Sequence, residues 1–298
     1  MRACLAAVLA IGCGSVDAKR PDAGPDVPDA PGGPRCDPSQ PFLNPTLVAN
    51  VNTASSDEAP RLSADELELF FSSDRPGGAG GLDLYVARRA SRDADFGAPE
   101  RIVELSTASS ESGPFLAADN LTLYYHPPLE IYVAMRPTRT APFGAGVPVA
   151  TINSNADDSE PYLTQNDQVM YFPSSRANGY EIYRSVRSGG AFGAPTLVAE
   201  LNTATSIDAH PVPSQDDLAI YWGTNRTDGG ADGKGDIWVA TRPSTSAPFG
   251  PAMRHGTLNT LSYDEPGWIS ADSCVMYLAS DRPGGLGGRD IYVARRPR

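Results

Sequence analysis

The sequence predicts an all-β protein, and three observations carry this prediction. One block of sequence recurs five times along the 298 residues. Each copy holds short segments rich in apolar, β-branched and aromatic residues, bounded by Gly, Pro, Asp and Ser, which is typical of strands. The acidic residue that precedes the third strand recurs at intervals of 47, 51, 55 and 54 residues. Four short strands per unit at this period indicate a closed, five-bladed β-propeller of four-stranded blades.

Two short motifs recur in every copy and set its register. The first is a Leu-Asn-Thr-like link that precedes the innermost strand. It occurs as Val51-Asn52-Thr53, Leu105-Ser106-Thr107, Ile152-Asn153-Ser154, Leu201-Asn202-Thr203 and Leu258-Asn259-Thr260. The second combines an acid, Ile or Leu, and an aromatic residue, and opens the third strand. It occurs as Asp83-Leu84-Tyr85, Glu130-Ile131-Tyr132, Glu181-Ile182-Tyr183, Asp236-Ile237-Trp238 and Asp290-Ile291-Tyr292.

In the first full copy, these motifs predict four strands in order. They lie at about 60–64, 67–72, 84–88 and 99–105, from the innermost to the outermost. Ser63-Ala64-Asp65 marks the tight turn between the first two strands, because Ser and Asp hydrogen-bond their own backbone there.

The end of the chain predicts how the ring closes. Residues 290–297 match a third strand, and no outermost strand follows them. Residues 42–53 match the pattern of an outermost strand. We therefore expect residues 42–53 to complete the last blade, which removes two exposed sheet edges. An open array of five units is the alternative, and it leaves this permuted register unexplained.

The repeats resemble the WD-like β-propeller repeats of the TolB type. The resemblance rests on Ser-Asp-Arg-Pro-Gly-Gly at 73–78 with Asp-Leu-Tyr-Val at 83–86, and on the matching segments at 280–285 and 290–293. It covers residues 42–298 and implies a propeller, whose roles in such proteins include envelope scaffolds, partner platforms and enzyme appendages. The second copy departs from the pattern at 125–129, where a short Pro-rich segment predicts a lower rim.

The N-terminus predicts export. Residues 1–13 resemble a bacterial lipoprotein signal in which Cys13 carries the lipid, and Gly14 after it suggests the outer membrane. Residues 14–41 predict a Pro-, Asp- and Gly-rich tether, and the propeller follows at 42–298. An ordinary signal peptide cut near Ala18 is the alternative. We expect a lipoprotein of the cell envelope, in the periplasm or on the surface, that meets the membrane only through its anchor.

Two cysteines fall within the predicted last blade. Cys36 lies at its turn between the third and fourth strands, and Cys274 begins its second strand. Both turns of a meander lie at the same end, and an exported chain meets an oxidising compartment. We expect Cys36 and Cys274 to form a disulfide, with two free thiols as the alternative.

An acidic column begins the innermost strands. It consists of Asp57, Glu111, Asp158, Asp208 and Asp264. We expect these five carboxylates to ring the pore mouth, where they would bind a divalent cation such as calcium or a basic partner. The structural alternative is that they accept backbone N–H groups in tight turns.

The acids that open the third strands form a second column. We expect it to pair with the arginines that open the preceding loops, at 75, 176, 226 and 282. The Gly-rich loop at 228–236 lacks the spacing of an EF-hand and favours a flexible hairpin over a calcium site.

Composition and motifs limit the function. A net charge of -12 argues against nucleic acid or an anionic membrane surface as a partner. Catalytic motifs are absent from the sequence, and its three histidines occupy unrelated repeat positions. We therefore predict a monomeric, non-enzymatic platform for an envelope protein or polymer, without a cofactor. The alternatives are a propeller that binds a cation or small ligand, and a glycoside hydrolase that uses pore carboxylates.

Overall fold

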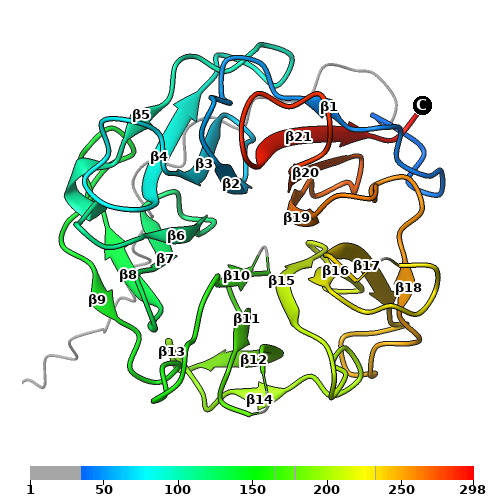
Figure 1. Ribbon diagram of the computed structural model, residues 1–298. Helices are drawn as coiled ribbons and strands as arrows, with labels where there is room; N and C mark the ends of the chain where they lie inside the picture. Colours follow the sequence, from blue (N-terminus) through cyan, green and yellow to red (C-terminus); the bar gives the residue numbers. More distant parts are fainter. Residues whose placement is uncertain (1–34, 165, 178, 232) are drawn as a thin grey trace, which may run out of the picture. The chain divides into compact units, whose positions relative to one another are not determined.

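Five antiparallel sheets surround one central axis (Figure 1). The computed structural model describes residues 35–164, 166–177, 179–231 and 233–298. These residues belong to one unit, Arg35–Arg298. The predicted all-β, five-bladed propeller is confirmed. The predicted signal, the lipidated Cys13 and the tether up to residue 34 lie outside the described residues.

Each blade is a meander of four strands ordered from the axis outward. Blade 1 contains β2 (Asp57–Leu62), β3 (Glu68–Ser73), β4 (Asp83–Arg88) and β5 (Glu100–Arg101), and a 3-10 helix (Val103–Leu105) follows it. Blade 2 contains β6 (Ser112–Leu116), β7 (Thr122–His126), β8 (Tyr132–Met135) and β9 (Val147–Pro148). Blade 3 contains β10 (Tyr162–Leu163), β11 (Val169–Ser174), β12 (Glu181–Ser188) and β14 (Thr196–Leu197), and β13 (Ala191–Phe192) also pairs with β12. Blade 4 contains β15 (Asp208–Pro213), β16 (Ala219–Thr224), β17 (Asp236–Thr241) and β18 (Met253–Arg254). Blade 5 contains β19 (Asp264–Ile269), β20 (Val275–Ser280), β21 (Asp290–Arg295) and β1 (Thr46–Leu47).

The observed strands of blade 1 differ from the predicted ones at two points. The innermost strand begins at Asp57, three residues before the predicted start, because Asp57 pairs with Ser73 in the ladder. The outermost strand pairs only at Glu100 and Arg101 and then turns into the 3-10 helix. Outer strands of this kind are short because the link to the next blade must leave the sheet.

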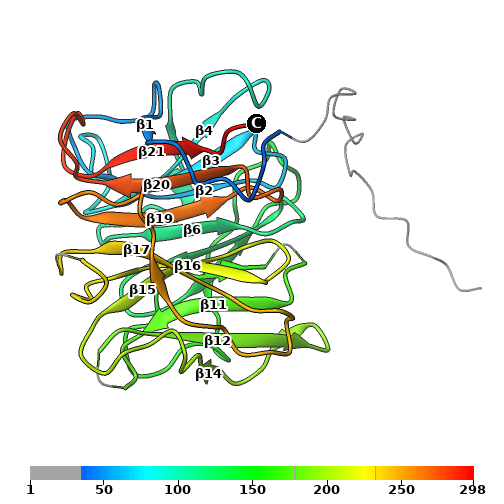
Figure 2. The ribbon, with the colours of Figure 1, turned by 90° about the vertical axis from the view of Figure 1, so that its right-hand side faces the viewer.

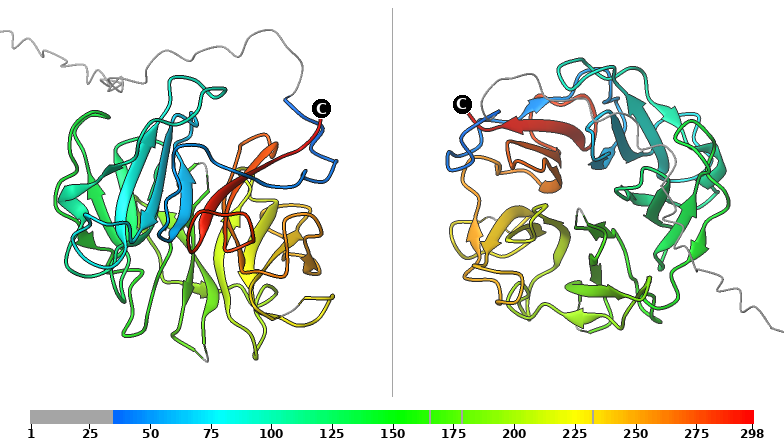
Figure 3. Two further views of the ribbon diagram at one scale, coloured as in Figure 1. Left: turned by 45° about the horizontal axis from the view of Figure 1, so that its top comes forward. Right: turned by 180° about the vertical axis from the view of Figure 1, so that it is seen from behind.

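The N-terminal segment closes the ring, as predicted. β1 pairs antiparallel with β21, so that Thr46 lies opposite Val293 and Leu47 opposite Tyr292. The described residues before it also contact blade 5: the N–H of Asp37 donates to the carbonyl of Pro297 at 2.9 Å. Figure 3 shows this segment beside the C-terminal strand. Residues 35–41, which we assigned to the tether, therefore lie against the propeller.

Cys36 and Cys274 form a disulfide whose Cα atoms are 5.6 Å apart. Their sequence separation of 238 residues means that this bond joins the two ends of the ring. Such a long covalent loop restricts the unfolded chain, which stabilises the folded state in a chain-entropy model.

The strands run between two faces of the ring (Figure 2). We call one the loop face, because it carries the links between blades and the loops between second and third strands. We call the other the turn face, because it carries the turns from first to second and from third to fourth strands. Residues of the second strands are mostly buried, and every residue of β3 and β20 is buried.

No helix among the described residues has the length and apolar character needed to cross a bilayer.

Candidate functional site

The first acidic column is buried and forms a brace at the loop face. None of its five carboxyl side chains is exposed. In blade 1, one oxygen of Asp57 accepts the N–H of Thr53 at 2.7 Å, and the other accepts Nη2 of Arg75 at 2.6 Å. The same guanidinium also donates to the carbonyl of Val51 at 2.8 Å. The brace therefore ties the link, the innermost strand and the long loop together.

The brace recurs with small variations around the ring. The carboxylate–arginine pairs are Asp57–Arg75, Asp158–Arg176, Asp208–Arg226 and Asp264–Arg282. Blade 2 has no such arginine, and Glu111 there accepts only the N–H and hydroxyl of Thr107 among the described contacts. These contacts correspond to the structural role that we considered for this column. Cation binding by the column stays a prediction.

The four brace arginines do not pair with the second acidic column, at the start of the third strands, so our prediction of that pairing is wrong. Each guanidinium folds back over the aromatic residue of the third strand, as Arg75 does over Tyr85 at 4.7 Å. This stacking carries it past Asp83 to the link between blades. Asp83 instead accepts the N–H of Ala79 within its own loop at 2.8 Å. Arg254, at the edge of blade 4, pairs with Asp236 at 2.7 Å.

Beyond the brace, the innermost strands bulge toward the pore. The ladder register shifts between Glu58 and Arg61 in blade 1 and between Ala209 and Val212 in blade 4. His210, within the irregular segment of blade 4, has a φ angle of 52°, and Glu160, just before β10 in blade 3, has one of 42°. Non-glycine residues seldom adopt this conformation, and bulges re-aim side chains. The bulges bring unequal side chains from different blades together.

One glycine shows how closely two blades approach at this level. Gly113 of blade 2 has a φ of 57°, and a Cβ built on it would lie 2.8 Å from Cα of Glu160. Only glycine fits this contact, so blades 2 and 3 approach each other closely at this level.

The resulting pore cluster consists of six residues. They are Glu58, Glu160, His210, Tyr263, Glu265 and Arg289.

The imidazole of His210 lies at the centre of the pore cluster. Its Nδ1 forms an ion pair with Glu160, and its Nε2 lies 3.0 Å from the hydroxyl of Tyr263 and 3.6 Å from Glu265. Arg289 crosses the ring of Tyr263 at 4.2 Å and contacts Glu58 at 2.7 Å and Glu265 at 3.4 Å. Three carboxyl groups therefore share two cationic partners.

The pore cluster separates the protonation states of its carboxyl groups. Burial raises the pKa of Glu58 to about 7, and Glu265 acts in the same direction against Arg289. Burial also disfavours the charged form of Glu160, but His210 outweighs it and lowers the pKa of Glu160. Burial lowers the pKa of His210, whereas Glu160 and Glu265 together raise it to about 9. A partly protonated Glu58 thus lies in the same cluster as an ionised Glu160 and a cationic His210.

A second polar group lies at the low rim of blade 2. Nε2 of His126 lies 3.2 Å from Asp157, and the hydroxyl of Tyr180 donates to the other oxygen of that carboxylate. The hydrogen bond from His126 lowers the pKa of Asp157. His126 also acts electrostatically on Glu160, so two of the three histidines belong to one region of the pore. The third histidine, His255, lies apart from this region. It packs against Phe42 and Tyr221, and burial lowers its pKa to about 4.

A small cavity leads from the loop face to the pore cluster. It measures about 90 Å³ and is lined by His210, Tyr263 and Thr224, among others. The hydroxyl of Thr224 is buried and has no hydrogen-bond partner within the described part of the chain. The equivalent serines of other blades bond to the brace arginine, as Ser73 does to Nε of Arg75 at 3.0 Å.

No three His, Cys, Asp or Glu side chains of the described residues are placed to hold a metal ion. Beside the loop face, the residues of the pore cluster and of the adjoining cavity are those that could bind a ligand other than a metal ion.

Comparison with known proteins identifies the fold. No protein-family model matches the sequence, and neither does any curated protein sequence. TolB from Acinetobacter baumannii is 16% identical with a TM-score of 0.49 over 81% of this chain, and the chain spans 54% of its length. A putative TolB from Agrobacterium tumefaciens is 15% identical with a TM-score of 0.51, covering 87% of this chain and 99% of that one. The match to the putative TolB from Agrobacterium tumefaciens confirms the predicted TolB-type propeller fold.

Enzymes share the same fold, which corrects our prediction of a non-enzymatic protein. A GH62 hydrolase in complex with xylotriose is 10% identical with a TM-score of 0.55, and covers 87% of this chain and 98% of that one. Further matches include a family-43 glycoside hydrolase, an endo-arabinase and an α-L-arabinofuranosidase. The prediction failed because we took carboxylates at equivalent positions as the only candidates, whereas the pore cluster occupies unequal ones.

The raised pKa of His210 predicts a pH-dependent stability. The group gains protons on folding, so its contribution is complete below about pH 6.5 and is lost as pH rises toward 9. The charged groups that face it are Glu160, Glu265 and Arg289, and Tyr263 bonds to it. Thermal unfolding of the wild type should therefore show a falling melting temperature between pH 7 and 9.

The variant His210→Gln provides the control for this measurement. It keeps a polar side chain but has no proton to lose, so its melting temperature should be lower at pH 7 and should fall less steeply than that of the wild type up to pH 9. Equal slopes for the two proteins would show that His210 does not carry the charge assigned to it.

Proposed function

We propose that the ring is an interaction platform of the bacterial cell envelope that receives a partner on its loop face. The proposal rests on the distribution of exposed apolar side chains. Five of them lie in the loops and links of this face: Val103, Leu129, Ile207, Leu261 and Leu286. Among the described loops on the turn-face side, Leu43 is the one exposed large apolar residue. Apolar side chains on one face of a ring suit protein contact.

The position of these residues supports a partner that spans several blades. Leu129 belongs to blade 2, Ile207 and Leu261 to the links on either side of blade 4, and Leu286 to blade 5. Leu261 is 78% exposed, the largest value among them. A partner that covers this face would also cover the entrance to the cavity beside the pore cluster, since Ile207 lines it.

The envelope location is part of the proposal. It is supported by the signal-like segment at 1–13 and by the disulfide between Cys36 and Cys274, because such bonds are typical of proteins in oxidising compartments outside the cytoplasm. An anchor at Cys13 would leave the ring free to meet a protein or a polymer. The net charge of -12 makes a nucleic-acid partner unfavourable.

In-cell photo-crosslinking tests the platform. A photoreactive residue at Leu286 should give a discrete cross-linked product, because that side chain faces the partner. The same residue at Met253 on β18 is the matched control, since both side chains are 61% exposed. Cross-links at Leu286 that disappear in Leu261→Asp support the proposal. Identical products from the two positions, or none from Leu286, contradict it.

The pore cluster favours a second candidate, a glycoside hydrolase. Its Glu58 has a pKa raised to about 7 while Glu160 stays ionised, and a split of this kind assigns an acid and a base or nucleophile. Glycoside hydrolases with the same fold support this candidate. Release of reducing sugar from xylan, arabinan and arabinoxylan tests it. Activity that is lost in Glu58→Gln and kept in Glu100→Gln, a change at an exposed outer-strand site, supports it, and no release by the wild type contradicts it.

A further inference from the structure

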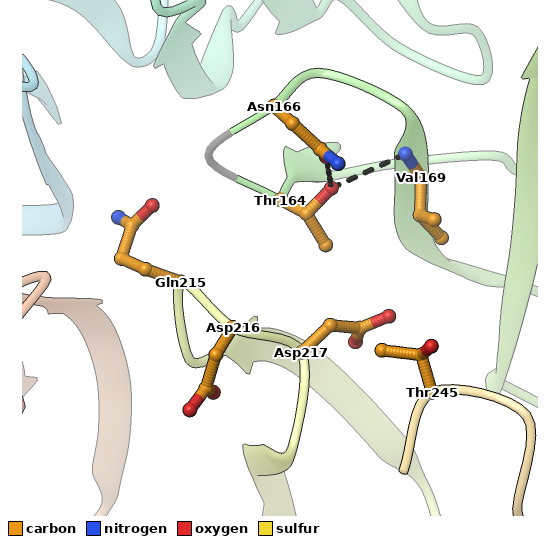
Figure 4. A pocket seen from close by; sticks show the side chains of 7 residues that line it. All are labelled: Thr164, Asn166, Val169, Gln215, Asp216, Asp217 and Thr245. Atoms are coloured by element: carbon orange, nitrogen blue, oxygen red, sulfur yellow. Dashed lines mark hydrogen bonds between the residues drawn. The ribbon is translucent and has the colours of Figure 1, made fainter.

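A cavity of about 470 Å³ lies on the turn face, between blades 3 and 4 (Figure 4). The turn from β10 to β11 forms one wall with Thr164 and Asn166. The turn from β15 to β16 forms the other with Gln215 and Asp216. Thr245, in the turn from β17 to β18, lies at the third side. Its size is within the usual range for small-ligand sites.

The equivalent space between blades 1 and 2 is filled by ion pairs. There, Arg139 donates to Glu68 at 3.0 Å and also pairs with Asp65. Arg136 donates to the same carboxylate of Glu68 at 2.9 Å. These side chains bridge the turn of blade 2 to the turn of blade 1 and occupy the space where Thr245 and Val169 line the cavity in blades 3 and 4.

The repeat places shorter, uncharged residues at three of these four positions in blades 3 and 4, whereas Arg242 takes the place of Arg136. Thr245 corresponds to Arg139, because both follow an Arg-Pro pair by two residues and precede an Ala-Pro-Phe-Gly segment. Val169 corresponds to Glu68 as the first residue of the second strand, and Asn166 corresponds to Asp65. Blades 3 and 4 therefore lack the ion pairs that Arg139 forms with Glu68 and Asp65, and a cavity lies there instead. Val169 and Thr245 line it.

Gln215 supplies an unused hydrogen-bonding group to this cavity. Its Oε1 is buried and lacks a hydrogen-bond partner within the described residues. The same turn position holds Ala64, Ala118 and Ala271 in blades 1, 2 and 5. The turn itself therefore does not need a glutamine, and the amide is available for a ligand.

The charges of the lining limit the class of ligand. Asp217 is paired with Arg242 and accepts the hydroxyl of Tyr171 at 3.0 Å, so its charge is compensated. Asp216 caps its own turn, accepting the N–H of Leu218 at 3.1 Å, and faces solvent. Neither a basic nor an aromatic side chain is among the lining residues that the structure describes. This lining is unfavourable for phosphates and for flat aromatic ligands.

We propose that this cavity binds a neutral sugar unit. Amide and hydroxyl groups from three turns line one space, and hydroxyl-rich ligands can both donate to and accept from such groups. Gln215 and Asn166 would supply amides from opposite walls, and Thr245 a hydroxyl from the third. The site lies on the face opposite the proposed platform and does not depend on it.

Calorimetric titration of the full-length protein tests the site. The probes are glucose, galactose, xylose and maltose as neutral sugars, with glucosamine and glucuronate as charged comparisons. We expect saturable binding of at least one neutral sugar. Gln215→Ala should weaken it by about tenfold, since a hydrogen-bonding partner is removed from a buried site. Its melting temperature should not change, because three other blades carry alanine at this position.

A second variant fills the cavity. Thr245→Arg introduces the residue that closes the space between blades 1 and 2, and it should abolish sugar binding without loss of stability. Thr140→Arg adds the same side chain at an exposed position on the corresponding turn of blade 2 and should bind like the wild type. Leu261→Asp on the loop face should also leave sugar binding unchanged. No saturable binding of any neutral sugar, binding of a charged sugar alone, or wild-type affinity in Thr245→Arg overturns the proposal.

Discussion

A buried carboxylate at the start of the innermost strand is the interaction on which the ring depends. A carboxylate taken out of water without partners costs several kcal/mol. In blade 1, Asp57 meets this cost with the N–H and hydroxyl of Thr53 and with the guanidinium of Arg75. The arginine in turn lies on Tyr85. One ion pair thus fixes the link between two blades, the first strand of the next blade and the loop after its second strand.

Because the brace holds the blades in place, the residues beside it can serve a function. Because the start of each innermost strand is fixed, the next two residues can differ between blades without disturbing the ring. Glu58, Glu160, His210 and Glu265 all lie at these positions. The turn face follows the same principle: Thr245 stands where blade 2 has an interblade arginine, and a cavity replaces an ion pair. Ligand recognition by this propeller therefore falls on equivalent positions at which the blades carry different residues.

The sequence predicts the scaffold far better than the site, for physical reasons. Period and strand composition repeat five times, so the blade number and the closing strand follow from them. The partner of Arg75 does not follow, because neighbours along a loop suggested Asp83, whereas stacking on Tyr85 directs the guanidinium to Asp57. The sequence-based prediction missed the pore cluster because it considered only the acidic column that all five blades share, and not the two positions that follow it in each blade. Comparison of those positions would have shown the glutamates and His210, although the left-handed backbone of Glu160 and His210 is visible only in the structure.

Amide hydrogen exchange tests the brace most directly. The N–H groups of Thr53, Ser154, Thr203 and Thr260 lie in links outside the strands, yet each donates to the buried carboxylate of its blade. The account predicts that these four amides exchange only when the whole ring unfolds, as slowly as those of β3 and β20. Gly189 and Gly230, on exposed turns, serve as the fast reference. Exchange of the four link amides at the rate of these glycines would contradict the account.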